Sequence, residues 1–337
     1  MVKKFTKCLR SLAKILMVCG VLYYLLTSSL LDFGLISKII GDVNFIIKII
    51  FTILVIMVLG NLKWFILLKS QKIEINFISC FYLYYIGYTF NYFLPGGIAG
   101  DAVKIGYIAK RNKKRSITAI SIIIDRGVGL LAMILIVLFF LPSLFSKINK
   151  LKWIVSDYSH LIIPYFIFIT FSTVLSFLIV FSLVRNKSFY KKITSLLKKR
   201  KGKIFFILLK LVRAVFAYRK SMLAIVLNIT LAILIQIIIS FSLFYIGQKI
   251  LGQDINIFSY NLASILTQII SIVPISPGGV GIGEVSFAKI LYYLNDRILL
   301  GYASIYFAFR MINILTCVPG ILLFAFGQKK LAAQNAN

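Results

Sequence analysis

The sequence predicts an all-α polytopic membrane protein with six full spans and two re-entrant Pro-Gly-Gly hairpins, arranged as an inverted repeat. Three observations support this prediction. Of the 337 residues, 60% are hydrophobic and only 14% are charged, whereas soluble domains carry roughly 25% charged residues. Apolar runs long enough to cross a bilayer recur along the chain. A Pro-Gly-Gly break interrupts an apolar segment in each half.

Six apolar runs approach or exceed the roughly 20 residues that a transmembrane helix needs. They lie at about 12–31, 49–68, 117–141, 161–184, 221–247 and 301–326. Two further runs, at about 77–94 and 259–273, lead into the breaks, and short apolar pieces at about 99–109 and 284–294 follow them. Because a helix rises about 1.5 Å per residue, these short pieces cover roughly half of the hydrocarbon thickness. We therefore expect each break to lie in a hairpin that enters and leaves on one side.

The two breaks share one order of residues. Each contains Pro-Gly-Gly, then a carboxylate six or seven residues after the proline, then an arginine 31 or 33 residues after it. The residues are Pro95, Gly96, Gly97, Asp101 and Arg126 in the first half and Pro277, Gly278, Gly279, Glu284 and Arg310 in the second. At membrane depth, irregular backbone occurs only where it is buried in protein or lines a wet cavity. We therefore interpret the breaks as the two halves of a transport site.

The basic residues predict the orientation of the chain. With the N-terminus in the cytoplasm and both hairpins re-entrant, 29 of the 39 Lys and Arg residues lie on the cytoplasmic side, as the positive-inside rule requires. A full crossing of the first hairpin would instead place the cluster at 110–115 outside. We expect one integral membrane domain over residues 1–337, with inverted repeats at about 9–141 and 158–327. Both termini are then cytoplasmic, in a multi-pass protein of the cytoplasmic membrane.

The net charge of +30 indicates a membrane face and not a nucleic-acid site, because the basic residues form short clusters between apolar runs. The longest basic segment, 185–220, alternates lysine-rich pieces with apolar ones. This pattern predicts one or two amphipathic helices at the cytoplasmic interface, where anionic lipids would be their partners. A solvated basic linker is the alternative.

The charges within apolar segments have two interpretations. Each costs about 2.5–3.5 kcal/mol at the centre of a span, so these side chains must face a polar interior. In one interpretation Arg126 and Arg310 hold an anionic head group, with Asp101 and Glu284 orienting them or carrying a coupling proton. In the other, the charges form fixed ion pairs that hold hairpins to spans. Lys104, one turn after Asp101, is either another head-group contact or a lysine that extends to the cytoplasm.

The sequence offers little for catalysis. It has one histidine, no His/Cys spacing typical of a metal site and no Gly-x-Ser-x-Gly motif. The four cysteines lie in or beside apolar runs without disulfide spacing. We expect no enzymatic activity, no cofactor and no metal.

Four segments carry a family resemblance: Asn91–Lys104, Ile123–Arg126, Pro274–Glu284 and Phe309–Asn313. Together they resemble the flippase-like family, which comprises the membrane region of lysylphosphatidylglycerol synthetases and related stand-alone membrane proteins. The resemblance covers nearly the whole chain. It implies movement of a lipid with a polar head group across the cytoplasmic membrane, as in aminoacyl-phosphatidylglycerol flipping. Some relatives are joined to glycosyltransferases and so contact polyprenyl-phosphate sugars.

Two departures from the family pattern affect the expected cargo. Lys104 stands where the family more often has Arg, and no aminoacyl-transferase domain follows Asn337. We therefore expect a stand-alone flippase that does not make the aminoacylated lipid itself. Its cargo is a phospholipid, an aminoacyl-phospholipid or a polyprenyl-phosphate lipid, and a cell-envelope glycosyltransferase or a lipid synthetase is a candidate partner.

Two other classes compete with this hypothesis: a non-transporting accessory protein of a glycosyltransferase or lipid-modifying system, and a membrane-embedded lipid-modifying enzyme. Direction, energy source and oligomeric state stay open at this point.

Overall fold

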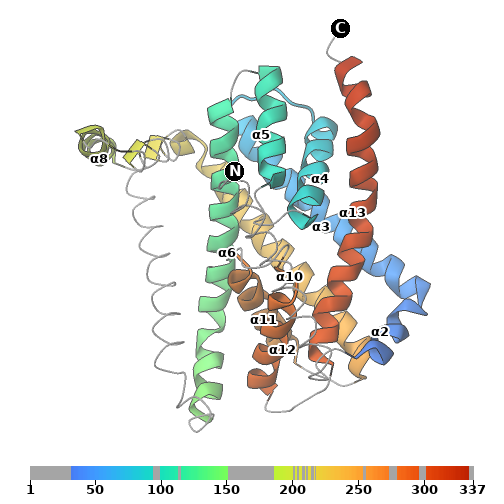
Figure 1. Cartoon of the computed structure of the whole chain (residues 1–337). Helices are drawn as coiled ribbons and strands as arrows, with labels where there is room; N and C mark the ends of the chain where they lie inside the picture. The colour runs from blue at the N-terminus through green and yellow to red at the C-terminus, as the bar shows by residue number, and fades with distance from the viewer. Residues whose placement is uncertain are drawn as a thin grey trace, which may run out of the picture. The chain divides into compact units, whose positions relative to one another are not determined.

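The computed structural model describes most of the chain. The described residues are 32–93, 99–112, 115–150, 186–199, 202, 205, 206, 209, 212, 213, 216, 218–252, 256–272, 279–295 and 301–333. Within these residues every regular element is a helix (Figure 1). The first half contains α2 (Phe33–Ile40), α3 (Val43–Ser70), α4 (Phe77–Phe93), α5 (Ala99–Asn112) and α6 (Arg115–Lys150). The second contains α8 (Lys187–Lys199), η1 (Tyr218–Lys220), α10 (Met222–Leu251), α11 (Ile257–Ile270), α12 (Ile282–Asn295) and α13 (Tyr302–Ala333).

Four of the predicted spans are helices that are long and apolar enough to cross a membrane. They are Val43–Ser70, Ile117–Phe140, Met222–Leu251 and Tyr302–Phe324. The predicted spans at 12–31 and 161–184 lie outside the described residues. The helical class of the protein is therefore confirmed in the described part, and the total of six spans stays a prediction.

Helix α2 was not predicted, because the sequence analysis places residues 32–48 between the first two spans. The Asp32 side chain caps the helix by accepting hydrogen bonds from the backbone N–H groups of Gly34 (2.8 Å) and Leu35 (3.2 Å). Ile36 and Ile39, three residues apart on one helix face, are buried in the core. An N-cap aspartate before this apolar spacing is a helix-start signal, so the segment could have been recognised.

The pieces on either side of the two breaks are helices as well. Helix α4 has 17 residues, and α5, α11 and α12 have 14 each. Helices α11 and α12 pack against each other. The breaks themselves, at 94–98 and 273–278, lie outside the described residues, so the re-entrant course of the hairpins stays a prediction.

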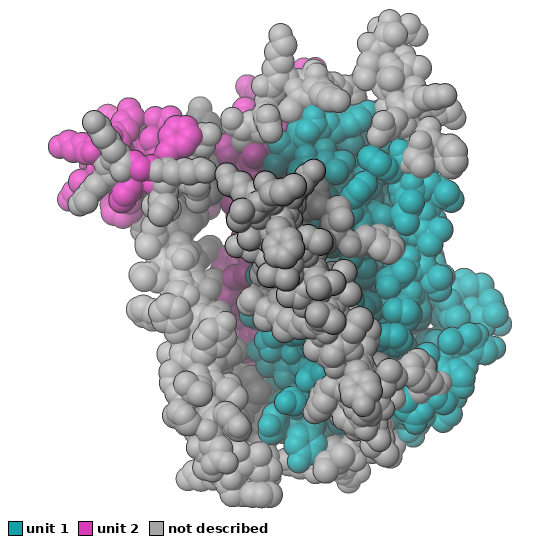
Figure 2. All heavy atoms as spheres, in the orientation of Figure 1, with its two compact units in different colours: residues 1–61, 76–107, 234–337 teal, residues 62–75, 108–233 magenta. Residues whose placement is uncertain are grey.

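The chain divides into two compact units (Figure 2). Unit 1 consists of residues 1–61, 76–107 and 234–337, and unit 2 of residues 62–75 and 108–233. The division passes through α3, α5 and α10. Each unit is described below by its own contacts.

The apolar core of unit 1 is built from faces of α2, α3, α10, α11, α12 and α13. Its largest fully buried side chains include Tyr260, Phe287 and Tyr302. Apolar side chains from both halves of the chain therefore pack together in this core, so the core depends on contacts between residues distant in sequence.

Helix α4 is fixed to α13 by a row of tyrosines on one face. Tyr82 donates to the Leu323 carbonyl (2.6 Å), and Tyr85 donates to the Thr316 carbonyl (2.5 Å). Tyr88 donates to the Asn313 side chain at 2.7 Å. These acceptors flank Pro319, which interrupts the hydrogen-bond pattern of α13 because it has no N–H. The tyrosines thus hold α4 to α13 on both sides of this proline.

Glycines bring α4 and α5 into backbone contact. A Cβ at Gly100 would overlap the Gly87 backbone, and one at Gly87 would overlap the Lys104 side chain. The Gly100 N–H also donates to the Asn91 side chain at 2.9 Å, which joins the end of α4 to the start of α5. Asn91 thus makes a hydrogen bond between helices.

We predict that Gly100→Ala separates α4 from α5 and lowers the apparent melting temperature and yield of the protein. The matched control is Gly106→Ala on the same helix, where a Cβ meets nothing within 4 Å and alanine favours the helix. Thermal unfolding of both variants in detergent checks this. Equal melting temperatures for Gly100→Ala and Gly106→Ala would contradict the close packing.

Candidate functional site

The predicted substrate-site residues are described in part. Asp101, Lys104, Arg126, Gly279, Glu284 and Arg310 lie in the described segments. Pro95, Gly96, Gly97, Pro277 and Gly278 lie outside them. The described part of the site therefore consists of the charged residues and the backbone around them.

The second-half carboxylate and arginine form a closed ion pair in unit 1. Arg310 Nε lies 2.7 Å from Glu284 Oε1, and both residues are buried, with 4% and 0% of their surface exposed. Arg310 Nη2 also donates to the Gly279 carbonyl at 3.0 Å. The guanidinium lies 5.6 Å from the centre of the Tyr306 ring. Arg310 therefore joins α13 to α12 and to the backbone just after the second break.

Glu284 has a second role as a helix cap. Its Oε2 accepts a hydrogen bond from the Gly281 N–H at 2.6 Å. Glu284 is the third residue of α12, so it reaches back to the N-cap position as in a capping box. Gly279 and Gly281 have φ values of 72° and 83°, a left-handed conformation that favours glycine. Gly279 and Gly281 are thus required by the backbone that Arg310 and Glu284 contact.

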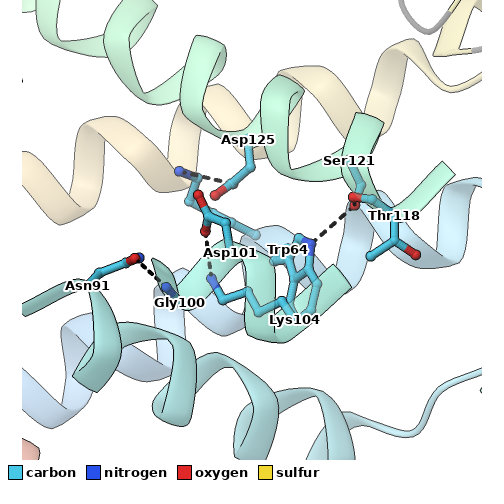
Figure 3. Close-up of polar contacts among 9 residues, drawn as sticks. Trp64, Asn91, Gly100, Asp101, Lys104, Thr118, Ser121 and Asp125 are labelled. Atoms are coloured by element: carbon cyan, nitrogen blue, oxygen red, sulfur yellow. Dashed lines mark hydrogen bonds and ion pairs between the residues drawn. The ribbon is translucent and has the colours of Figure 1, made fainter. Parts of the chain in front are cut away.

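The first-half carboxylate occupies the same helical position. Asp101 is the third residue of α5 and lies 3.7 Å from Lys104 Nζ, with both residues buried (Figure 3). Lys104 Nζ is also 4.5 Å from the centre of the Tyr84 ring, within reach of a cation–π interaction. Lys104 therefore turns inward, which disfavours the alternative that it extends to the cytoplasmic surface.

Arg126 differs from Arg310 because it is exposed, although it lies inside the candidate span Ile117–Phe140. The residue before it, Asp125, is paired with Lys63: Asp125 Oδ1 lies 3.3 Å from Lys63 Nζ. The Lys63 side chain is 9% exposed and that of Asp125 is 22% exposed. Both belong to unit 2, so the pair joins α3 to α6 within that unit.

The Lys63–Asp125 pair was missed by the sequence analysis, which counted Lys63 among the cytoplasmic lysines. Opposite charges inside two apolar runs, 49–68 and 117–141, were the available signal. Buried polar groups of unit 2 surround the pair. Asn228 of α10 donates to the Lys63 carbonyl at 2.8 Å, and Trp64 donates to Ser121 at 3.2 Å (Figure 3).

Amide side chains link α10 to α11 in unit 1. Gln236 donates to the Gln268 oxygen at 3.2 Å, and Gln268 donates back to Gln236 at 2.9 Å and to Ser264 at 3.1 Å. Such hydrogen bonds between polar side chains are typical of helix contacts in membranes. Thr267 and Ser271, on the same helix, have buried hydroxyls with no hydrogen-bond partner.

The described residues contain no group of three or more His, Cys, Asp or Glu side chains placed to hold a metal ion. The carboxylates Asp101, Asp125 and Glu284 are instead each paired with one cationic side chain. Such pairs can exchange one partner for the phosphate or ammonium of a bound lipid.

The fold and these charges define a multi-pass α-helical membrane protein with buried ion pairs where its helices are interrupted. The chain matches the family model described as the lysylphosphatidylglycerol synthase TM region over residues 11–320. Because the match covers nearly the whole chain, the protein belongs to this family, whose function is related to membrane lipids. No curated protein and no solved structure matches the chain.

We predict that removing either partner of the Glu284–Arg310 pair destabilises the protein. Glu284→Gln or Arg310→Gln leaves a buried charge without its partner, which typically costs about 3–5 kcal/mol. The double variant should regain much of the loss, because no uncompensated charge remains. Thermal unfolding of the two single variants and the double variant measures this.

The control for this cycle is Lys249→Gln, which breaks the exposed pair between Lys249 and Asp42 (2.8 Å) and should change the melting temperature little. A double variant less stable than either single variant would argue against a simple ion pair.

In unit 2 we predict that Lys63→Met lowers the melting temperature more than Lys69→Met does. Lys63 is buried beside Asp125, whereas Lys69 is exposed on the same helix. Asp125→Asn added to Lys63→Met should restore stability. If Lys63→Met and Lys69→Met behave alike, the Lys63–Asp125 pair contributes nothing measurable.

Proposed function

We propose that this protein is a lipid flippase of the cytoplasmic membrane that moves a lipid with a polar, phosphate-containing head group between leaflets. The observation that carries the proposal is Arg126, an exposed arginine within a candidate span. A guanidinium at that depth is costly unless it is paired or solvated, and its exposure leaves Arg126 within reach of an anion from the lipid. A lipid phosphate is the anion present in every leaflet, and arginine suits bidentate phosphate contact.

The paired motifs support the same proposal. Asp101 and Glu284 each occupy the third position of a helix that begins just after a Pro-Gly-Gly break. Helix N-termini favour anions, and these two are partly occupied by the protein's own carboxylates. We propose that Asp101, Lys104, Gly279, Glu284 and Arg310 of unit 1 contact the lipid head group together with the two breaks. Arg126 of unit 2 is proposed as a separate head-group contact. No catalytic step is part of the proposal.

A second candidate function has its own support. Glu284, Arg310 and the Gly279 carbonyl satisfy one another in the structure, which is what a fixed brace between helices requires. A non-transporting accessory protein of a cell-envelope glycosyltransferase or lipid-modifying system would need only such braces. The test must therefore separate loss of transport from loss of fold.

We predict that Arg126→Gln abolishes transport in proteoliposomes while the protein inserts and elutes as the wild type does. Arg126→Lys, which keeps the charge, should retain part of the activity. The assay follows dithionite reduction of head-group-labelled lipids, with separate arms for phosphatidylglycerol, phosphatidylethanolamine, an aminoacyl-phosphatidylglycerol and a polyprenyl phosphate. Wild-type rates equal to protein-free liposomes in every arm would remove the flippase proposal and favour the accessory role.

The Glu284→Gln/Arg310→Gln double variant separates the two interpretations of the second half. We expect its stability to recover and its transport to stay lost, because the proposed site needs the guanidinium itself. Recovery of both would make these residues braces and would place the head-group contacts elsewhere.

A further inference from the structure

Helix α8 presents two chemically different faces. With about 100° between successive residues of an α-helix, Phe189, Ile193, Leu196 and Leu197 fall on one side. The opposite side carries only lysines and hydroxyl residues, and the helix contains no acidic residue. Its lysines are Lys187, Lys191, Lys192, Lys198 and Lys199. No residue of α8 is buried, and Leu196 is 56% exposed, so the protein does not enclose the apolar side.

An aromatic contact holds α8 to the chain that precedes α10. The Tyr190 ring of α8 stacks on Phe216, with centroids 3.7 Å apart and planes 6° from parallel. The Arg219 guanidinium lies 4.1 Å from the centre of the same Phe216 ring. Tyr190 lies at the edge of the apolar side, so this contact leaves most of that side uncovered.

Hydrogen bonds hold the chain segment just after Phe216 at the end of a candidate span. Tyr218 donates to the Leu67 carbonyl at 3.3 Å, and Ser221 donates to the Ser70 carbonyl at 3.4 Å. Leu67 and Ser70 lie in the last turn of α3, which ends at Ser70. All these residues belong to unit 2. The contact between Tyr190 and Phe216 that holds α8 is therefore near the place where one candidate span ends and the next, Met222–Leu251, begins.

The direction of α8 agrees with this position. In Figure 1, α8 is seen nearly along its axis, whereas α6 of the same unit runs up the page. Helix α8 thus lies across the direction of a candidate span. This is the orientation expected of a helix that lies in the plane of a bilayer surface.

We propose that α8 is a docking surface for a leaflet that contains anionic lipid. Phe189, Ile193, Leu196 and Leu197 enter the boundary between head groups and acyl chains, and the lysines contact lipid phosphates. Five positive charges without a carboxylate on the helix select an anionic leaflet over a neutral one. This proposal goes beyond the flippase proposal and does not depend on transport.

The test places a fluorescent label on each face of α8 in the full-length protein. Leu196→Cys and the matched control Ser195→Cys are made after the four native cysteines are changed to Ala, and both variants are reconstituted in nanodiscs. Brominated lipids report contact with the bilayer and iodide reports contact with water. In phosphatidylglycerol-containing nanodiscs we expect lipid quenching at 196 and iodide quenching at 195.

Charge dependence is tested with Lys→Gln variants on the same labelled protein. Each lysine near an anionic surface changes its partitioning about fivefold, so Lys198→Gln/Lys199→Gln should reduce the docked population markedly. High salt and phosphatidylcholine-only nanodiscs should do the same. Leu197→Ser, which keeps every lysine, should reduce lipid quenching at 196 by weakening insertion.

Three outcomes would overturn the proposal. Equal water access at 195 and 196 would make α8 a solvated helix. Protection of 196 from both iodide and brominated lipid would indicate a protein partner on the apolar side. If lipid quenching at 196 does not change with salt, lipid charge or the lysine substitutions, an anionic leaflet is not the partner of α8.

Discussion

The pairing of charges in an apolar surrounding is the constraint on which the described structure most depends. A charge placed in hydrocarbon costs several kcal/mol unless it is solvated or paired. Arg310 meets this requirement through Glu284 and the Gly279 carbonyl, and Lys63 meets it through Asp125. Each pair joins two different helices, α12 to α13 in the first case and α3 to α6 in the second. The electrostatic requirement of one side chain thus becomes a restraint on where two helices lie.

A second, steric device appears at corresponding places in the two halves. A Cβ at Gly60 of α3 would overlap the Tyr84 hydroxyl of α4, and a Cβ at Gly247 of α10 would overlap the Tyr260 hydroxyl of α11. In both halves the helix before the break therefore places a tyrosine against a glycine of the span that precedes it. Small residues that admit a neighbour closely are typical of helix packing in membranes. This correspondence supports the predicted repeat, which hydropathy and the paired motifs suggested.

The sequence was most informative where a local pattern determines the structure. Apolar length predicted four helices now described as candidate spans, and the Pro-Gly-Gly breaks predicted where the shorter helices end. The pairing of Glu284 with Arg310 was one of two interpretations, because their spacing alone does not show whether the guanidinium is satisfied. Lys63 could not be placed from periodicity. Its burial depends on Asn228 of α10 and on Asp125 of α6, which only the tertiary fold brings near.

The charges of the Glu284–Arg310 pair bear on which lipid head group the proposed transport site can accept. An entering phosphate can take the place of Glu284 or of the Gly279 carbonyl as an acceptor of Arg310, and an anion added to a neutral pair leaves one negative charge in excess. A positive charge from either of two groups can balance this excess negative charge. A proton on Glu284 suits a head group that brings only negative charge, such as a polyprenyl phosphate. An ammonium on the cargo itself can pair with the displaced Glu284, as an aminoacylated or ethanolamine head group allows. If transport proceeds through Arg310, the first type of cargo therefore requires proton movement and the second does not.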